Sequence, residues 1–195
     1  MIRTNRLIIA LALASSTLAG TAAMADHHKM ASHSNMANPT VGGAAMAPNK
    51  TIVANASAAP NLTTLVAAVK AAGLVDTLAS PGPFTVFAPT NTAFEKLPAG
   101  TVGTLVKPEN KALLTTILTY HVVAGKLTST DIVAAIKAGG GTATLTTVAG
   151  EKLSARLSGN SVVITDGKGG QSAVTTVDVM QSNGVVHVID SVLLP

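Results

Sequence analysis

The residue types of a hydrolytic triad occur close together near the C-terminal end of the chain, as His187, Asp190 and Ser191. In an extended strand the step from His187 to Ser191 spans about 13 Å, which is too far for the hydrogen bond that activates a serine nucleophile. Asp190 points to the opposite face of the strand from both, because side chains alternate. We therefore expect no enzymatic activity. We expect Asp190 to be held in a structural hydrogen bond, because a buried charge must be paired.

A second candidate site is the adjacent pair Tyr120 and His121. The pair follows a buried helical stripe and precedes two valines, so we expect both rings to be buried with their polar atoms hydrogen-bonded. The other interpretation is that the two side chains contact a binding partner directly. The sequence leaves both open, since a buried pair can also shape a nearby surface.

A metal site is the third possibility, because three of the five histidines lie in the segment 26–49. If the chain is cleaved after Ala25, its new N-terminus is Asp26, His27 and His28. The free amine, two deprotonated amides and the third-position imidazole can enclose Cu(II) or Ni(II) in a square plane. Thioethers, which suit Cu(I), are present nearby in Met30, Met36 and Met46. The alternative to such an extracytoplasmic copper- or nickel-binding protein is a leader without metal function, and no other cofactor is indicated.

Residues 1–25 have the order of a secretory signal peptide. Two arginines precede the apolar run 7–14, and Ala23 and Ala25 are small residues before a cleavage point. The run is too short to span a bilayer, which requires about 20 apolar residues, and no later run would anchor the cleaved chain. The sequence therefore predicts a secreted or periplasmic product without a transmembrane anchor.

Charge and cysteine content exclude further classes. Loss of the two arginines would lower the net charge from +4 to +2, and the remaining lysines are scattered. Nucleic-acid binding needs concentrated positive charge, so we expect no nucleic-acid partner. The chain has no cysteine, so its stability must come from an apolar core.

Two segments follow the predicted signal. Residues 26–49 lack a helical or alternating apolar period, which predicts a flexible linker, whereas residues 50–195 have the size of one domain. In the first half of that domain apolar residues recur at helical spacing behind capping residues such as Asn61 and Thr128. The predicted helices occupy 61–72, 90–97, 108–118 and 128–138. The buried stripe of the third is expected to consist of Leu113, Leu114, Ile117 and Leu118.

The second half of the domain changes to a twofold period typical of strands. Turns separate five predicted strands at 142–148, 152–157, 162–164, 173–179 and 185–194, and a proline-bracketed strand lies earlier at 83–89. Helices followed by strands predict an α+β domain with an antiparallel meander, not a parallel βαβ sheet.

Three stretches share the order and spacing of one known family. They are TVFAPTNTAF at 85–94, LTYHVV at 118–123 and NGVVHVIDSVLLP at 183–195. Together they resemble the fasciclin domain over residues 50–195. The resemblance implies a fasciclin-like β-wedge of about seven strands with several helices packed on it.

The same resemblance implies a secreted or surface-attached adhesion or interaction module. Its partner would be a protein or an extracellular-matrix component such as a polysaccharide. In animal members the Tyr-His region has been tied to integrin binding, which assigns a partner-binding role by position to Tyr120 and His121. The oligomeric state stays open.

Overall fold

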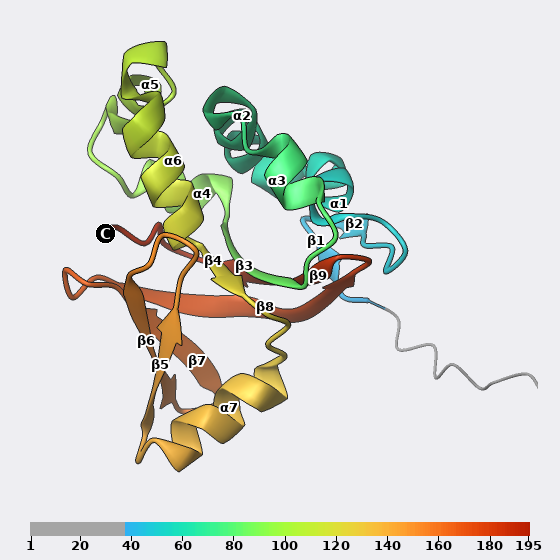
Figure 1. Cartoon of the computed structure of the whole chain (residues 1–195), viewed down its shortest axis with the longest axis vertical. Helices are drawn as coiled ribbons and strands as arrows, with labels where there is room; N and C mark the ends of the chain where they lie inside the picture. The colour runs from blue at the N-terminus through green and yellow to red at the C-terminus, as the bar shows by residue number, and fades with distance from the viewer. Residues whose placement is uncertain (1–37) are drawn as a thin grey trace, which may run out of the picture. The chain divides into compact units, whose positions relative to one another are not determined.

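The computed structural model describes residues 38–195 (Figure 1). The predicted signal peptide and the first part of the predicted linker lie outside these residues. The helices are α1 Ile52–Ala58, α2 Thr63–Ala72, α3 Val75–Ala79, α4 Asn91–Glu95, α5 Thr101–Leu105, α6 Lys111–Tyr120 and α7 Ser129–Ala138. The strands are β1 Thr40–Val41, β2 Ala44–Ala45, β3 Phe84–Pro89, β4 Val122–Ala124, β5 Thr142–Thr146, β6 Lys152–Ser158, β7 Ser161–Thr165, β8 Gln171–Gln181 and β9 Gly184–Ile189.

Seven strands form a sheet in the order β4-β3-β9-β8-β7-β6-β5. Neighbouring strands are antiparallel except β3 and β9, which run parallel. The two ends of the sheet meet where Val123 bridges Thr147 and the Val148 N–H donates to the Val122 carbonyl at 2.7 Å. The sheet is therefore nearly closed, and the predicted α+β class with about seven strands is confirmed.

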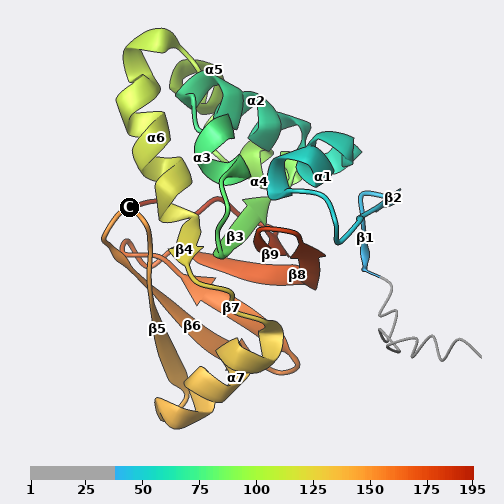
Figure 2. The ribbon, with the colours of Figure 1, turned by 45° about the vertical axis from the view of Figure 1, so that its right-hand side comes forward.

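Helices cover the sheet in two places. Figure 2 shows α1, α2, α3 and α6 gathered beside β3 and β9, whereas α7 lies against β5 and β6. Each group of helices covers its own apolar cluster. Strand β3 serves both clusters, because Val86 and Ala88 belong to the first and Phe87 to the second. Every residue of β9 is buried, as expected for a strand covered on both faces.

Local signals in the sequence fix several helix ends. The Thr128 side chain accepts from the Asp131 N–H and the Asp131 carboxylate accepts from the Thr128 N–H, so the predicted capping box opens α7. The Thr90 hydroxyl caps α4. Gly73 ends α2 with a φ of 73°, in the left-handed region that glycine adopts without strain.

One buried asparagine attaches the first helices to the sheet. Asn183 accepts from the Ile52 N–H at 3.0 Å and donates to the carbonyls of Leu78 and Ser80 at 2.7 and 3.0 Å. The next residue, Gly184, lies so close to Phe84 that an added Cβ would stand 2.0 Å from its carbonyl oxygen. Gly184 therefore allows the backbone of β9 to approach β3 closely. Asn183 provides hydrogen-bond partners for the backbone at the start of α1 and at the end of α3.

Residues 38–49 differ from the prediction of a flexible linker that extends to residue 49. They form the β1–β2 hairpin, in which Val41 and Met46 are buried in the first apolar cluster. Asn38 also exchanges two hydrogen bonds with the Met180 backbone, at 2.6 and 3.0 Å. Two isolated apolar residues show no helical or alternating period, so the burial of these two side chains against the domain was not predicted. The folded body therefore includes this hairpin, and the Met46 thioether is not free for a copper ion.

Two details of the predicted helices are also corrected. Asn61 lies inside a short 3₁₀ turn, Pro60–Leu62, and does not cap α2 with its side chain. Leu113, expected in the buried stripe of α6, is 51% exposed, whereas Leu114 is 2% exposed. Among residues 38–195 no single helix is long and apolar enough to cross a membrane; a combined span would have to include the 106° bend between 52–58 and 60–72.

Candidate functional site

Tyr120 is the last residue of α6 and its side chain is fully buried. Its hydroxyl accepts a hydrogen bond from the Gly167 N–H at 2.8 Å and donates to the Lys152 carbonyl at 3.3 Å. Burial of the ring raises the pKa of Tyr120, although the Gly167 hydrogen bond acts in the opposite direction. The phenol therefore joins the end of α6 to β6 and to the β7–β8 turn.

His121 is buried directly after Tyr120, at the C-terminal end of α6. Its Nε2 accepts from the Leu193 N–H at 3.0 Å, which leaves Nδ1 to donate to the Ile117 carbonyl at 2.8 Å. A neutral imidazole has one donor and one acceptor, and both are used here. Burial lowers the pKa of His121 to about 4, because the protonated ring would lose its hydration and its bond from Leu193.

The placement of Tyr120 and His121 bears on both interpretations of this pair. Their side chains are 0% and 2% exposed, and every polar atom has an internal partner. The structure therefore has them in the structural role, in which they fix the segments around 152, 167 and 193.

His187 lies in β9 on the same side of the sheet as Phe87, with which its ring stacks at a centroid distance of 5.8 Å. Its Nδ1 accepts from the Asp178 N–H at 3.3 Å, and its Nε2 donates to the Leu127 carbonyl at 2.8 Å. Burial lowers the pKa of His187. Like His121, this histidine is a neutral, fully hydrogen-bonded member of the interior.

Asp190 accepts from the Ala173 N–H at 2.9 Å and from the Lys96 ammonium at 3.2 Å. Partial burial acts to raise the pKa of Asp190, but these hydrogen bonds and the lysine charge outweigh it and lower the pKa. The structural hydrogen bond predicted for Asp190 is present. Neither Asp190 nor Ser191 is a hydrogen-bond partner of His187, so these residues do not assemble a triad.

The Ser191 hydroxyl instead accepts from the Lys96 ammonium at 3.2 Å. The ammonium also donates to the Asp190 carboxylate, which accepts from the Ser191 hydroxyl as well, at 3.2 Å. This exposed cluster of Lys96, Asp190 and Ser191 ties the end of α4 to the residues that follow β9.

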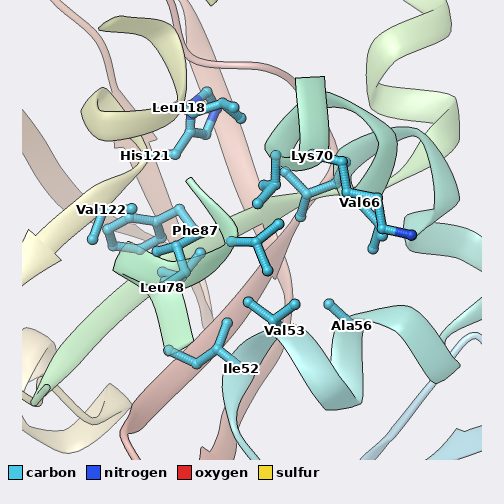
Figure 3. Close-up of a pocket in the computed structure, with 14 residues that line it drawn as sticks. Ile52, Val53, Ala56, Val66, Lys70, Leu78, Phe87, Leu118, His121 and Val122 are labelled. Atoms are coloured by element: carbon cyan, nitrogen blue, oxygen red, sulfur yellow. The ribbon is translucent and has the colours of Figure 1, made fainter. Parts of the chain in front are cut away.

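Sequence reasoning missed an apolar cleft between the helices (Figure 3). The cleft is shallow, with a volume of only about 30 Å³, and Phe87 and His121 belong to its inner wall. The other lining residues are Ile52, Val53, Ala56, Leu65, Val66, Val69, Lys70, Val75, Leu78, Val86, Leu118 and Val122. One wall is α1, at 52–58, which was not predicted because it has no apolar period.

The predicted metal ligands Asp26, His27 and His28 lie outside the described residues. Within the part of the chain that the structure covers, no group of three or more histidine, aspartate or glutamate side chains could hold a metal ion. The Cu(II) or Ni(II) site therefore stays a prediction from the sequence.

Comparison with known proteins identifies the motifs. The family model described as "Fasciclin domain" matches residues 60–195. Protein sll1483 of Synechocystis is 48% identical over 145 residues, which cover 74% of this chain and 73% of that protein. Immunogenic protein MPB70 of Mycobacterium bovis is 42% identical over 165 residues, which cover 82% of this chain and 77% of that protein.

A solved structure has the same fold. It is the FAS1 domain pair from the insect cell adhesion molecule Fasciclin I, which superposes with a TM-score of 0.66 at 24% sequence identity. The match covers 76% of this chain and 52% of that one.

Proposed function

The chain belongs to the fasciclin family, and from this premise we propose that it is an extracytoplasmic adhesion or interaction module that binds a protein or matrix component. Members of this fold include a molecule named for insect cell adhesion. Membership of this family supports an interaction role in general. The kind of partner and the location outside the cytoplasm are the parts that we propose for this chain.

One observation carries the proposal. The histidine and tyrosine side chains of the three shared motifs are buried and hydrogen-bonded within the domain, and the Asp190 carboxylate accepts from the Ala173 N–H. Catalysis needs a base or nucleophile within hydrogen-bond reach of a substrate, whereas these groups hold segments of the fold to one another. The function left for such a domain is to present its surface to another molecule.

Tyr120 and His121 have an indirect part in this proposal. The pair positions the β7–β8 turn through Gly167 and the C-terminal segment through Leu193. The partner-binding role that the family resemblance assigns to the pair would then operate through the exposed β7–β8 turn at Gly167. The secretory signal predicted at residues 1–25 supports the location, and N-terminal sequencing of the exported protein tests it at Ala25.

The test uses the cleaved chain, from residue 26, as bait on intact envelopes of the native cell. We expect saturable binding that is weakened by Tyr120→Phe. This substitution removes the acceptor of the Gly167 N–H but keeps the aromatic ring that fills the core. Leu113→Gln, on an exposed face of α6, is the matched control for a surface change away from the motif.

Two outcomes would overturn the proposal. The first is an absence of saturable binding to the envelope. The second is enzymatic turnover, in a broad substrate screen, that is abolished by His121→Ala in a variant whose circular dichroism shows an intact fold.

A further inference from the structure

One side of strands β5, β6 and β7 lies outside the core. On the other side, apolar side chains of these strands pack with α7 in the second apolar cluster (Figure 2). Because side chains alternate along a strand, the remaining residues point outward, and the register aligns Thr144, Ser154 and Thr165 in one row across the three strands. We call the outward residues the outer face. Each of them is exposed or half-buried, and they are Thr142, Thr144, Thr146, Lys152, Ser154, Arg156, Ser158, Ser161, Val163 and Thr165.

The outer face is an open array of hydrogen-bonding groups. Most of its side chains are serine or threonine, whose hydroxyl both donates and accepts. Adjacent strands lie about 4.8 Å apart, so the hydroxyls of one row are neighbours. An open surface of this kind takes a ligand that lies along it, and the hydroxyl groups of a sugar chain match its hydrogen-bonding groups.

Two cations, Lys152 and Arg156, belong to the outer face, and both are exposed. They are four residues apart in β6, which separates their Cα atoms by about 13 Å. Lys168 is a third exposed cation, in the β7–β8 turn. This turn lies beside the start of β6, because the Tyr120 hydroxyl is bonded both to the Lys152 carbonyl and to the Gly167 N–H. The basic groups therefore follow β6 and continue at the edge of the outer face.

Acidic groups do not neutralise these cations. Within the described part of the chain, neither Lys152 nor Arg156 forms an ion pair. The Arg156 guanidinium instead donates to a neutral group, the Gln171 Oε1, at 2.7 Å. Glu151 precedes Lys152 in the chain but lies in the loop before β6, outside the outer face. The outer face itself has no carboxylate, so it attracts an anionic ligand.

We propose that the outer face binds a linear acidic polysaccharide, with carboxylates of the polymer at Lys152 and Arg156 and its hydroxyls along the serine and threonine rows. This inference rests on the interaction module proposed above and names the chemistry of its partner. A single exposed charge pair is weak, so a polymer that repeats its carboxylate is favoured over a small anion. A protein partner would need an apolar or aromatic centre in the interface, and the outer face offers only the half-buried Val163.

Titration calorimetry of the cleaved chain with polygalacturonate, a linear polymer with one carboxylate on each sugar, tests the proposal. We expect saturable binding at low ionic strength that weakens as salt is added, and much weaker binding of the neutral methyl ester of the same polymer. Lys152→Gln combined with Arg156→Gln should weaken binding about two- to fivefold for each exposed charge and about four- to twenty-fivefold for both. Lys107→Gln combined with Lys137→Gln removes the same charge from exposed positions outside the sheet. This matched control should leave the affinity unchanged.

A second variant locates the polymer on the sheet. Thr144→Glu places a like charge in the central row of the outer face and should weaken binding about two- to fivefold, whereas Thr104→Glu, at an exposed position of α5, should weaken it less. Circular dichroism reports whether each variant keeps the fold. No binding of polygalacturonate, equal binding of its methyl ester, or equal weakening by the two double variants would overturn the site.

Envelope binding separates this inference from the interaction module. If envelopes bind the chain and polygalacturonate does not, the outer face is overturned and the module stands. If polygalacturonate binds the outer face and envelopes do not, the module is overturned and the site stands. Envelope binding that is lost after protease treatment of the envelopes, and that the Lys152 and Arg156 double variant retains, would point to a protein partner and overturn the polysaccharide assignment.

Discussion

Acidification is expected to weaken this domain through His121, whose pKa is lowered in the folded state. The unfolded chain takes up a proton on this histidine near pH 6.5, whereas the folded domain does so only near 4. Protons therefore favour the unfolded chain between these values. The neutral ring makes its full contribution to the unfolding free energy above pH 6.5, and this contribution is lost completely once the pH has fallen below about 4.

The magnitude follows from the pKa difference. A pKa change of one unit corresponds to about 1.4 kcal/mol, so the lowering from 6.5 to about 4 bounds the loss at about 3 kcal/mol. Between about pH 7.5 and about pH 5 the expected loss is about 2 kcal/mol. His187 acts in the same direction, because burial lowers its pKa as well. Asp190, with a lowered pKa, loses its contribution only in more acidic solution.

Urea unfolding followed by circular dichroism, across this pH range, measures the effect. The comparison is His121→Gln, whose side-chain oxygen can accept from the Leu193 N–H but does not titrate. We expect the variant to be less stable at neutral pH and to have a shallower dependence of the unfolding free energy on pH. Equal pH dependence in both proteins would refute the argument, because His121 would then have the same pKa folded and unfolded.

Three further predictions concern packing, the buried phenol and the N-terminus. Leu114→Ala should cost about 2–5 kcal/mol of unfolding free energy, whereas Leu113→Ala on the exposed side of α6 should change it by less than about 0.5 kcal/mol; similar losses would contradict the placement of α6. Tyr120→Phe should cost about 1–3 kcal/mol in thermal unfolding, because the Gly167 N–H loses its acceptor, and an unchanged midpoint would argue against that bond. Calorimetry with Cu(II) should detect binding to the chain that begins at Asp26 and much weaker binding when one residue precedes it; equal affinities would dismiss the metal site.

Elements with strong local signals could be predicted from the sequence. The Thr128 capping box, the stop at Gly73 and the alternating strands of the second half each arise from short-range chemistry that a sequence displays. The triad at His187 is absent for a different reason from the one expected: the predicted strand 185–194 ends at Ile189, so Asp190 and Ser191 lie beyond it, and the His187 ring is bonded to Asp178 and Leu127.

Elements that depend on distant partners could not be predicted. Helix α1 buries only Ile52 and Asn55, and the Asn55 amide is satisfied by Gln181 and by the Ala47 backbone. Such a helix has no apolar period to detect. The β1–β2 hairpin is held in the same way, through contacts with residues more than a hundred positions away. The cleft was invisible for this reason, because one of its walls is α1.

The central claim is that the histidines of the motifs are buried and hydrogen-bonded within the domain. The most direct test of this claim is to determine the tautomers of the two imidazole rings. Long-range nitrogen–proton NMR correlations on the labelled protein, near neutral pH, distinguish which ring nitrogen carries the proton. The account predicts a neutral ring protonated at Nδ1 for His121, unchanged down to about pH 5.5, and a neutral ring protonated at Nε2 for His187, whose pKa is also lowered. Rings that titrate near pH 6.5 with mixed tautomers would contradict it and return these histidines to the list of groups available for chemistry.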